Sequence, residues 1–262
     1  MKNKKITILY GGETSEREVS LRTGQAMYNV LTAGGYQHVK LLDATRANIT
    51  ELVNERPDVC LMALHGKHGE DGLMQGYLEM LNIPYTGSGV AASAVAFDKY
   101  LTKLCFDAKQ IPTAKYWLAG EEDEELLSTL KTAMHFQTCV VKPSREGSTV
   151  GISIVKAPAD YDKAVAEAAK YDKKVLVEAF IEGKELTIAI FEGRALPAIW
   201  IKPNSGFYDY QSKYTKGATQ YLFDTALNKE DTTLINETAL AAYQALGCDG
   251  VARVDIIFDG KT

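Results

Sequence analysis

A polar loop between two apolar runs carries the residue types that hold phosphate groups. The first run ends at Lys142, and residues 143–151 then place two glycines around the hydroxyls of Ser148 and Thr149. Backbone N–H groups, hydroxyls and a basic residue at the rim form a cradle for anions. The Walker order, strand–GxxxxGK[ST]–helix, is absent from this stretch. We therefore expect a strand, a phosphate-binding loop and a second strand at 152–155; an ordinary hairpin turn is the alternative.

Two further charged residues could act together with such a loop. Lys99 falls within a run that predicts one helix over residues 90–110, where a lysine is ordinarily a solvated charge. It could bind a phosphate only if the loop faces it. Glu16 falls in the first turn of a helix that follows Gly11 and Gly12. One interpretation is that this carboxylate only interacts favourably with the helix dipole. The other is that it binds the ammonium group of a substrate.

The segment from His65 to Asp71 has residue types that can bind a metal, but not the usual spacing. His65 and His68 are followed by Glu70 and Asp71, with glycines at 66, 69 and 72. A His-x-x-His pair on a glycine-rich loop lacks the helical or zinc-type spacing of metal ligands. We interpret the segment as a tight turn around a small ligand.

The first part of the chain predicts an alternation of strands and helices that would position these residues. Expected strands cover 6–10, 39–42 and 59–64, and expected helices start near 16 and cover 49–54 and 72–81. Such an alternation predicts a parallel sheet with ligands at the carboxyl ends of its strands. Loops 11–16 and 65–72 leave two of those ends.

The helix that starts near Glu16 has its own expected signals. Ser15 and Glu18 have the spacing of a capping box. An apolar stripe is expected to face the core, formed by Val19, Ala26, Met27, Val30 and Leu31.

The rest of the chain predicts mainly strands and hairpins. Expected strands cover 113–118, 139–141, 175–181, 186–191, 194–201 and 251–258, and expected helices cover 160–170 and 231–246, with another opening in the acidic run 121–125. A turn at Glu192-Gly193 would join two of the strands. The long polar segment 202–220 contains several tyrosines, which favours a lid over a site rather than disorder. On strand 251–258, Arg253 and Asp255 would share one face.

Composition excludes several classes of protein. The chain has 262 residues, 46% of them hydrophobic and 24% charged, with a net charge of −5. That balance gives no electrostatic basis for binding nucleic acid or an anionic membrane. Four cysteines (Cys60, Cys105, Cys139 and Cys248) lack paired spacing, so we expect four buried thiols in a reducing, cytoplasmic setting. No apolar run is long enough for a signal peptide or a membrane span.

Several motifs together resemble one known family. They are Gly-Gly-Glu-Thr-Ser-Glu-Arg-Glu-Val-Ser (11–20), Ala-Leu-His-Gly (63–66), Gly-Glu-Asp-Gly (69–72), Tyr-Thr-Gly-Ser-Gly (85–89), the 142–151 loop, Phe-Tyr-Asp-Tyr-x-x-Lys-Tyr (207–214) and Arg-Val-Asp (253–255). In this order they resemble the D-alanine–D-alanine ligase family of the ATP-grasp superfamily. The resemblance runs along essentially the whole chain, and the set is specific although each motif alone is weak.

The resemblance implies an α/β ATP-grasp fold, with an N-terminal parallel-sheet domain and two β-rich α+β units that enclose the nucleotide. The implied domains are 1–86, 87–182 and 183–262. The implied reaction passes the γ-phosphate of ATP to the carboxylate of one D-alanine, and a second D-alanine then displaces it. The implied setting is peptidoglycan precursor synthesis by a cytoplasmic homodimer. A D-alanine–D-lactate ligase and a truncated, non-catalytic nucleotide-binding form are the alternatives.

The resemblance also implies a role for each candidate site residue. Lys99, Lys142, Ser148 and Thr149 match phosphate-binding positions, and Lys213 matches a lid residue that contacts the γ-phosphate and substrate. Glu178 and Glu185 match the adenine and ribose positions. Glu16, Ser148 and Tyr214 match a hydrogen-bonded triad that orients the D-alanines, with Glu16 also binding the first ammonium group. His65 matches a substrate-pocket residue, and Arg253 matches the cation that stabilises the tetrahedral oxyanion.

The chain departs from the family pattern in two ways. Ala179 stands where many members have a lysine, at a contact made largely by backbone. Asp255 matches one ligand of Mg²⁺ (or Mn²⁺), but the other ligands lie in a Glu-x-Asn segment that would follow residue 262. We therefore expect strand 251–258 to have an unpaired edge, and a chain that ends at Thr262 to bind nucleotide weakly and turn over poorly.

Overall fold

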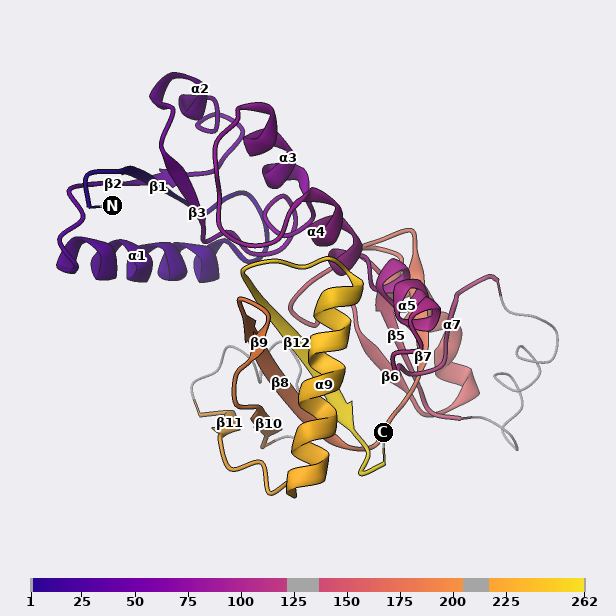
Figure 1. The fold of residues 1–262 in the computed structure, drawn as a ribbon. Coiled ribbons are helices and arrows are strands. Elements are labelled where there is room, and N and C mark those ends of the chain that lie inside the picture. Colours follow the sequence, from indigo (N-terminus) through magenta and orange to yellow (C-terminus); the bar gives the residue numbers. More distant parts are fainter. Residues whose placement is uncertain (1, 122–136, 205–216, 262) are drawn as a thin grey trace. The chain divides into compact units, whose positions relative to one another are not determined.

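The structure, a computed structural model, describes residues 2–121, 137–204 and 217–261 (Figure 1). The chain forms two compact units, which are described separately. The first comprises Met1–Ala96 with Gly247–Val251, and the second Phe97–Leu246 with Ala252–Thr262.

The first unit is built on a three-stranded parallel sheet. Its strands are β1 (Lys5–Tyr10), β2 (His38–Asp43) and β3 (Val59–Met62), in the order β2-β1-β3. Both neighbours run parallel to β1, in register from Ile6 to Leu9. The alternation of strands and helices therefore predicted this sheet correctly, and the loops after β1 and β3 leave its carboxyl edge.

Helices cover both faces of this sheet (Figure 1). They are α1 (Arg17–Ala33), α2 (Glu51–Glu55), α3 (Leu73–Met80) and α4 (Val90–Phe97). Helix α1 runs along one face, and α2 and α3 lie on the other. Fully buried Leu9, Leu52 and Leu78 belong to one apolar cluster, which joins β1 to α2 and α3. Burial of each such leucine contributes about 1.5–3 kcal/mol of transfer free energy.

Helix α1 contacts the sheet through small residues and not through the expected apolar stripe. Its buried residues are Ser20 and Gly24, whereas Val30 is 71% exposed. A Cβ atom on Gly24 would lie 2.5 Å from Cβ of Tyr10, so the helix approaches β1 too closely for a larger side chain. The capping box is also absent, because the N-cap residue is Glu16 and it makes no side-chain capping bond.

The single helix predicted over 90–110 is broken at Asp98. Helix α4 ends at Phe97, and α5 (Lys99–Ala108) begins two residues later. Asp98 adopts an extended conformation, and its carboxylate accepts hydrogen bonds from the backbone N–H groups of Tyr100 and Leu101. The first turn of a helix has backbone N–H groups without a partner in the helix, and Asp98 accepts hydrogen bonds from two of them. A second helix is therefore favoured to begin at Lys99.

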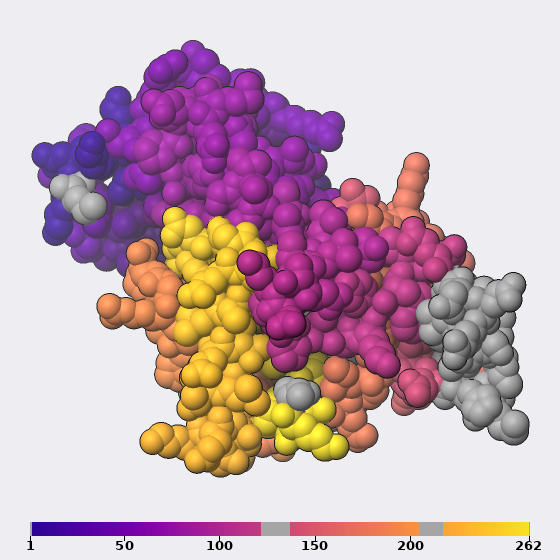
Figure 2. Space-filling view, turned by 45° about the vertical axis from the view of Figure 1, so that its right-hand side comes forward, coloured from indigo at the N-terminus to yellow at the C-terminus, as the bar shows by residue number. Residues whose placement is uncertain are grey.

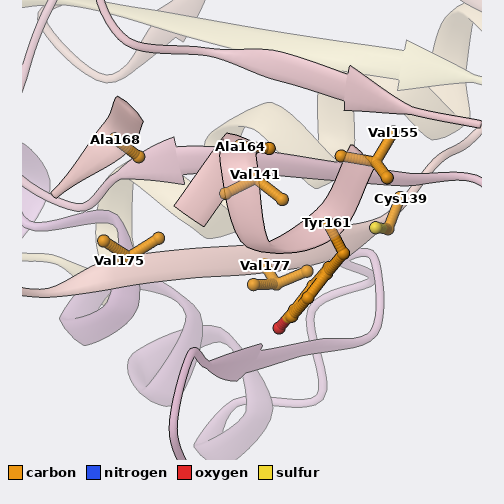
Figure 3. Close-up of a cluster of buried hydrophobic side chains, with 8 residues drawn as sticks. All are labelled: Cys139, Val141, Val155, Tyr161, Ala164, Ala168, Val175 and Val177. Atoms are coloured by element: carbon orange, nitrogen blue, oxygen red, sulfur yellow. The ribbon is translucent and has the colours of Figure 1, made fainter. Parts of the chain in front are cut away.

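The second unit contains a four-stranded antiparallel sheet that carries the expected phosphate loop. Its order is β4 (Tyr116–Leu118), β7 (Val175–Ala179), β5 (Cys139–Pro143) and β6 (Ser153–Val155). The short helix η1 (Pro158–Asp160) leads into α7 (Tyr161–Ala168), which contacts β5 and β6. Val141 and Val177 are fully buried beside Tyr161 in the core between sheet and helix (Figure 3). The prediction of strand, loop and strand is confirmed.

A five-stranded sheet completes the second unit. It contains β8 (Lys184–Phe191), β9 (Arg194–Ala195), β10 (Ile199–Pro203), β11 (Thr219–Leu222) and β12 (Val251–Phe258), in the order β11-β10-β8-β12 with β9 on β8. Glu192 and Gly193 both have positive φ at the predicted hairpin turn. Within the described residues β12 ends the strand order, as expected. Helix α9 (Lys229–Ala245) contacts β8 and α5, and its surface, in yellow-orange, lies beside α5 in Figure 2.

The four cysteines are free thiols, but only two of them are buried. Cys60 and Cys139 are buried, while Cys105 and Cys248 are half-buried, so the expectation of four buried thiols is wrong for two. Burial raises the pKa of Cys60 to about 12, which makes its thiol unreactive near neutral pH. In the described part of the chain, no helix has the length and apolar character to cross a membrane.

Candidate active site

The predicted phosphate loop faces Lys99 directly. The backbone N–H of Lys99 donates a 3.0 Å hydrogen bond to the carbonyl of Ser144. Its ammonium group donates to the carbonyls of Ser144 (3.3 Å) and Glu146 (2.5 Å). Because the helix breaks at Asp98, Lys99 lies at the start of α5 and not in the middle of a helix, and there it contacts the loop. The condition under which Lys99 could act on a phosphate is therefore met.

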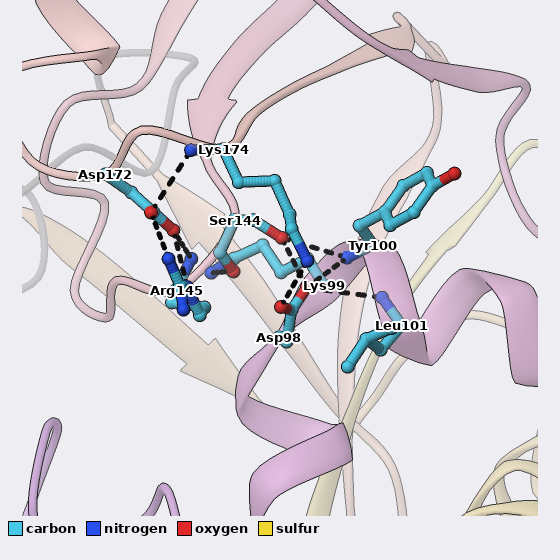
Figure 4. Close-up of polar contacts among 8 residues, drawn as sticks. All are labelled: Asp98, Lys99, Tyr100, Leu101, Ser144, Arg145, Asp172 and Lys174. Atoms are coloured by element: carbon cyan, nitrogen blue, oxygen red, sulfur yellow. Dashed lines mark hydrogen bonds and ion pairs between the residues drawn. The ribbon is translucent and has the colours of Figure 1, made fainter.

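Asp98 and Ser144 join the start of α5 to the base of the loop (Figure 4). Ser144 Oγ donates to Asp98 Oδ1 at 2.6 Å and accepts from the N–H of Tyr100 at 3.1 Å. Lys174 Nζ lies 2.9 Å from Asp98 Oδ2. Burial acts to raise the pKa of Asp98, but these hydrogen bonds and the lysine lower it below its ordinary value. The carboxylate therefore stays ionised and keeps both segments together.

A second ion pair holds the other side of the loop base. The backbone N–H of Arg145 donates to Asp172 at 2.9 Å, and its guanidinium pairs with both oxygens of the same carboxylate at 3.0 and 2.7 Å (Figure 4). Ser144 N–H donates to the carbonyl of Lys174. Residues 144 and 145 are thus fixed by backbone and side-chain bonds, which leaves the loop beyond them as the part that can meet a ligand.

The loop itself has an unusual backbone. Ser148 and Thr149 have φ of 52° and 64°, in the left-handed region that non-glycine residues rarely adopt. Gly151 also has positive φ, and a Cβ there would lie 2.7 Å from the ring of Tyr171. Such conformations cost about 1–3 kcal/mol each and cluster at ligand-binding sites. Hairpin turns also contain residues with positive φ, so the contact of this loop with Lys99, and not its backbone conformation, favours the binding role.

Lys142 and Glu178 lie in a cluster of charges next to Lys99. Lys142 Nζ is 2.5 Å from Glu178 Oε2, and Lys103 Nζ is 3.1 Å from Oε1. Burial lowers the pKa of Lys99 to about 8, and the nearby charge of Lys142 adds to this shift. Burial acts to raise the pKa of Glu178, but Lys142 and Lys103 lower it below its ordinary value. The cluster presents partly desolvated positive charge, as a triphosphate site requires.

Glu185, Arg253 and Asp255 belong to the five-stranded sheet. Asp255 Oδ1 accepts a 2.7 Å hydrogen bond from Thr187, and Oδ2 accepts one of 3.1 Å from Arg253. Arg253 and Asp255 therefore share one face of β12, as predicted. Glu185 is half-buried on β8, opposite Ile201 on β10. Among the described residues, no three His, Cys, Asp or Glu side chains gather as a metal site.

The first unit holds Glu16 and His65 at the carboxyl edge of its sheet. Glu16 is the N-cap residue of α1 and makes no side-chain capping bond. A Cβ atom on Gly66 would lie 2.7 Å from its Oε2, so the loop after β3 passes directly against this carboxylate. His65 Nε2 lies 3.0 Å from Thr23 Oγ1, and Nδ1 lies 3.9 Å from Glu70 Oε1. The two predicted substrate residues are thus on neighbouring loops at the expected sheet edge.

A pocket of about 230 Å³ opens at the same edge. His65 lines it, and Glu16 does not; its wall is mostly apolar and includes Leu64, Leu73, Met74 and Tyr77. The loop after β2 also contributes, through Ala44 to Arg46. The sequence interpretation considered only the loops after β1 and β3. The parallel alternation itself indicates that the carboxyl end of β2 meets the other two there.

The site residues thus fall into groups. The structure brings Lys99, Lys142 and Glu178 together beside the loop of Ser148 and Thr149. It places Glu185, Arg253 and Asp255 on the second sheet of that unit, and Glu16 and His65 in the other unit. Lys213 and Tyr214 lie outside the described residues. Asp98, Ser144 and Lys103 have structural roles at the site that sequence reasoning missed, although Asp98 has a recognisable N-cap residue type.

Comparisons with known proteins identify the family of the chain. The family models "D-ala D-ala ligase N-terminus" and "D-ala D-ala ligase C-terminus" match residues 37–88 and 106–262. The D-alanine–D-alanine ligase of Syntrophotalea carbinolica is 44% identical over 259 residues, which cover 98% of this chain and 82% of the relative.

Solved structures of ligases share the fold. The D-alanine–D-alanine ligase of Bacillus anthracis has a TM-score of 0.84 at 33% identity, with 98% of this chain and 83% of that chain covered. The same enzyme complexed with ATP has a TM-score of 0.82 at 32% identity, with the same coverage. The expected ATP-grasp α/β fold is confirmed. The chain belongs to the D-alanine–D-alanine ligase family.

Proposed function

We propose that this chain joins two molecules of D-alanine into D-alanyl-D-alanine, with cleavage of ATP to ADP and phosphate. The observation that carries the proposal is the position of Lys99 beneath the strained loop of Ser148 and Thr149, beside the Lys142–Glu178 pair. This combination suits a nucleotide triphosphate, and the family match specifies the ligase. The product would serve peptidoglycan precursor synthesis in the cytoplasm. We further propose a homodimer with domains at 1–86, 87–182 and 183–262.

The nucleotide would lie in the second unit. Lys99 and Lys142 would bind phosphate oxygens as point charges, and Ser148 and Thr149 would add hydroxyl donors. Glu178 would accept from the amino group of adenine. Glu185, half-buried on β8, would accept from ribose hydroxyls, and Lys213 would contact the γ-phosphate from the lid segment.

The amino acids would be bound with residues of the first unit. Glu16 would pair with the ammonium group of the first D-alanine, and its contact with Gly66 fixes where that carboxylate can lie. His65 would line the substrate pocket, held by Thr23. Ser148 and Tyr214 would complete a triad with Glu16 that orients both substrates.

The proposed reaction uses these residues in two steps. A carboxylate oxygen of the first D-alanine attacks the γ-phosphorus, the bond to the β-phosphate oxygen breaks, and ADP leaves. The free amine of the second D-alanine attacks the acyl carbon, and Arg253 stabilises the tetrahedral oxyanion. Phosphate then leaves with the bonding electron pair and the amine loses a proton, which yields the dipeptide. Holding both substrates in place supplies much of the rate by removing the entropy cost of encounter.

Asp255 is the residue that would hold Mg²⁺ or Mn²⁺. Its carboxylate is exposed and chemically suitable, because Mg²⁺ is commonly held by one or two carboxylates together with substrate phosphates. The ion would neutralise charge on those phosphates. Thr187 and Arg253 hydrogen-bond to Asp255 and would orient it.

Phosphate release tests the proposal. With ATP, Mg²⁺ and D-alanine, a protein that carries this chain together with the Glu-x-Asn segment of the family should release phosphate and form D-alanyl-D-alanine, and L-alanine should not replace D-alanine. Lys142→Ala should remove the activity, and thermal unfolding of the same variant measures the stability that is lost when the buried Glu178 loses one of its two lysines. Nucleotide binding without any D-alanine-dependent phosphate release would contradict the ligase assignment. Light scattering of the same sample tests the dimer.

A further inference from the structure

Lys103 is a buried lysine that the reaction above does not use. It lies on α5 one turn after Lys99, and its side chain is 8% exposed. Its ammonium nitrogen has three acceptors: Thr113 Oγ1 at 2.6 Å, the carbonyl of Ala114 at 3.0 Å and Glu178 Oε1 at 3.1 Å. Three acceptors match the three protons of an ammonium group. The nitrogen also lies 5.1 Å from the ring centre of Tyr116, so its position is fixed on several sides.

Glu178 divides its two carboxylate oxygens between two lysines with different surroundings. Oε1 contacts Lys103, which also donates hydrogen bonds to Thr113 Oγ1 and to the carbonyl of Ala114. Oε2 contacts Lys142, the lysine at the end of β5 where the phosphate loop begins. If Lys142 turns from Glu178 to the oxygens of a bound triphosphate, Glu178 Oε2 can accept a hydrogen bond from another donor. Lys103 then remains as the cation beside a carboxylate whose side chain is only 12% exposed.

We propose that Lys103 is a positioning residue for nucleobase selection: it holds Glu178 so that Oε2 accepts a hydrogen bond from the exocyclic amino group of adenine. This inference rests on the proposed nucleotide site. Guanine carries a carbonyl oxygen where adenine carries that amino group, and two acceptors facing each other repel. Without Lys103, a buried carboxylate would lose its fixed partner and would turn away or take up a proton. Selection of adenine would be lost while the phosphate contacts remain.

The test measures binding of ADP, GDP and inorganic tripolyphosphate by titration calorimetry. Lys103→Met should weaken ADP binding by roughly ten- to hundredfold, the range for a hydrogen bond to a charged group. Binding of tripolyphosphate should change by less than about twofold, because it carries no base, and GDP binding should not weaken, because guanine loses a repulsive contact when Glu178 turns away. Lys109→Met, at the exposed end of α5, is the matched control and should change none of the three.

The outcomes separate this inference from the proposed function. If the unmodified chain binds none of the three ligands, the nucleotide site itself is wrong. If it binds them and Lys103→Met weakens all three equally, Lys103 only supports the fold and the inference is overturned. Unchanged ADP binding overturns it as well.

Two further variants keep the inference open to refutation if Lys103→Met does not fold. Thr113→Val removes one acceptor of Lys103 without removing the charge, and should lower the ADP-to-GDP preference to a smaller extent. Glu178→Gln should lower the same preference, since an amide can present its N–H₂ group instead of an acceptor. An unchanged preference in the variant that folds would refute the role of the Lys103–Glu178 pair.

Discussion

Ser144 Oγ donates a 2.6 Å hydrogen bond to Asp98 Oδ1, which joins the base of the phosphate loop to the cap of α5. Lys99 follows Asp98 directly, and its N–H is bonded to the carbonyl of Ser144. This pair of residues thus joins the lysine to the loop that would bind the same phosphates. Part of the ordering that ligand binding would otherwise require is already present in the fold.

Replacing Ser144 should therefore weaken both the fold and nucleotide binding. Ser144 is fully buried, and Ser144→Ala leaves the Tyr100 N–H and the Asp98 carboxylate short of a partner. We expect a loss of about 1–3 kcal/mol in the free energy of unfolding. Weaker ADP binding should accompany it, measured by calorimetry.

Ser20→Ala is the matched control for this change. Ser20 is equally buried, and its hydroxyl donates a 2.6 Å hydrogen bond to the carbonyl of Ala63 in the first unit. It should cost similar stability and leave ADP affinity unchanged. Equal affinity losses in the two variants would mean that the Ser144 bond has no specific role in the phosphate site.

The lowered pKa of Lys99 predicts a pH dependence of nucleotide binding. Its pKa is about 8 instead of 10.5, chiefly through burial. Only the protonated form attracts phosphate, so ADP affinity should be constant below pH 8 and fall as pH rises above it. Lys99→Met should bind more weakly and lose this dependence. Calorimetry from pH 6.5 to 9.5 in one ionic strength measures both.

The same shift predicts an opposite trend for stability. Between pH 8 and 10.5 the unfolded chain binds more protons at Lys99 than the folded chain does. By linkage, the contribution of Lys99 to the free energy of unfolding should therefore rise with pH in this window. Urea unfolding gives the free energy of unfolding at each pH for the unmodified chain and for Lys99→Met. This free energy should depend differently on pH in the two proteins between pH 8 and 10.5, and the same pH dependence in both would contradict a lowered pKa of Lys99.

The sequence predicted the elements whose signals are local, and it failed where tertiary contacts decide. The parallel sheet and the hairpin at Glu192-Gly193 follow from alternation and turn residues, and both were found. The single helix over 90–110 was wrong because the cap at Asp98 is stabilised by Ser144, 46 residues away. Apolar periodicity could not indicate that partner.

The predicted burial of α1 failed for a related reason. Apolar periodicity favoured Val30, yet the helix approaches β1 through Gly24, which leaves no room for a side chain against Tyr10. At the site, the loop pattern pointed to Lys142 and the family resemblance pointed to Glu178, whereas neither of them pointed to Lys103. Its role becomes visible only when its contact with Glu178 is known.

Lys142 and Lys99 should contribute unequally to ADP binding. Lys142 lies where the loop begins and pairs with Glu178, a partner that it can exchange for a phosphate. Lys99 instead donates hydrogen bonds to carbonyl groups of the loop. Lys142→Ala should therefore remove the thermal shift by ADP more completely than Lys99→Ala. A ligand at a hundred times its dissociation constant adds about 2.7 kcal/mol, so the full shift is easily measured. Lys163→Ala, on the exposed face of α7, should keep it; an undiminished shift in both site variants would make the loop a plain hairpin turn.

The contact between Gly66 and Glu16 predicts a substrate effect without a nucleotide effect. A Cβ at Gly66 would lie 2.7 Å from Glu16 Oε2, closer than real atoms approach, so Gly66→Ala must displace the carboxylate or the loop. We expect the KM for D-alanine to rise by about tenfold, the effect of weakening one charged hydrogen bond, with ADP binding unchanged.

Gly193→Ala separates this clash from the cost of the backbone conformation. Gly193 has φ of +71°, almost equal to the +72° of Gly66, but a Cβ there would meet no atom within 4 Å. Each variant should lose about 1 kcal/mol or more of stability, because alanine disfavours positive φ. Only Gly66→Ala should then change the kinetics with D-alanine. If both variants keep the KM of the unmodified chain at matched folded fractions, Glu16 does not bind the ammonium group from this position.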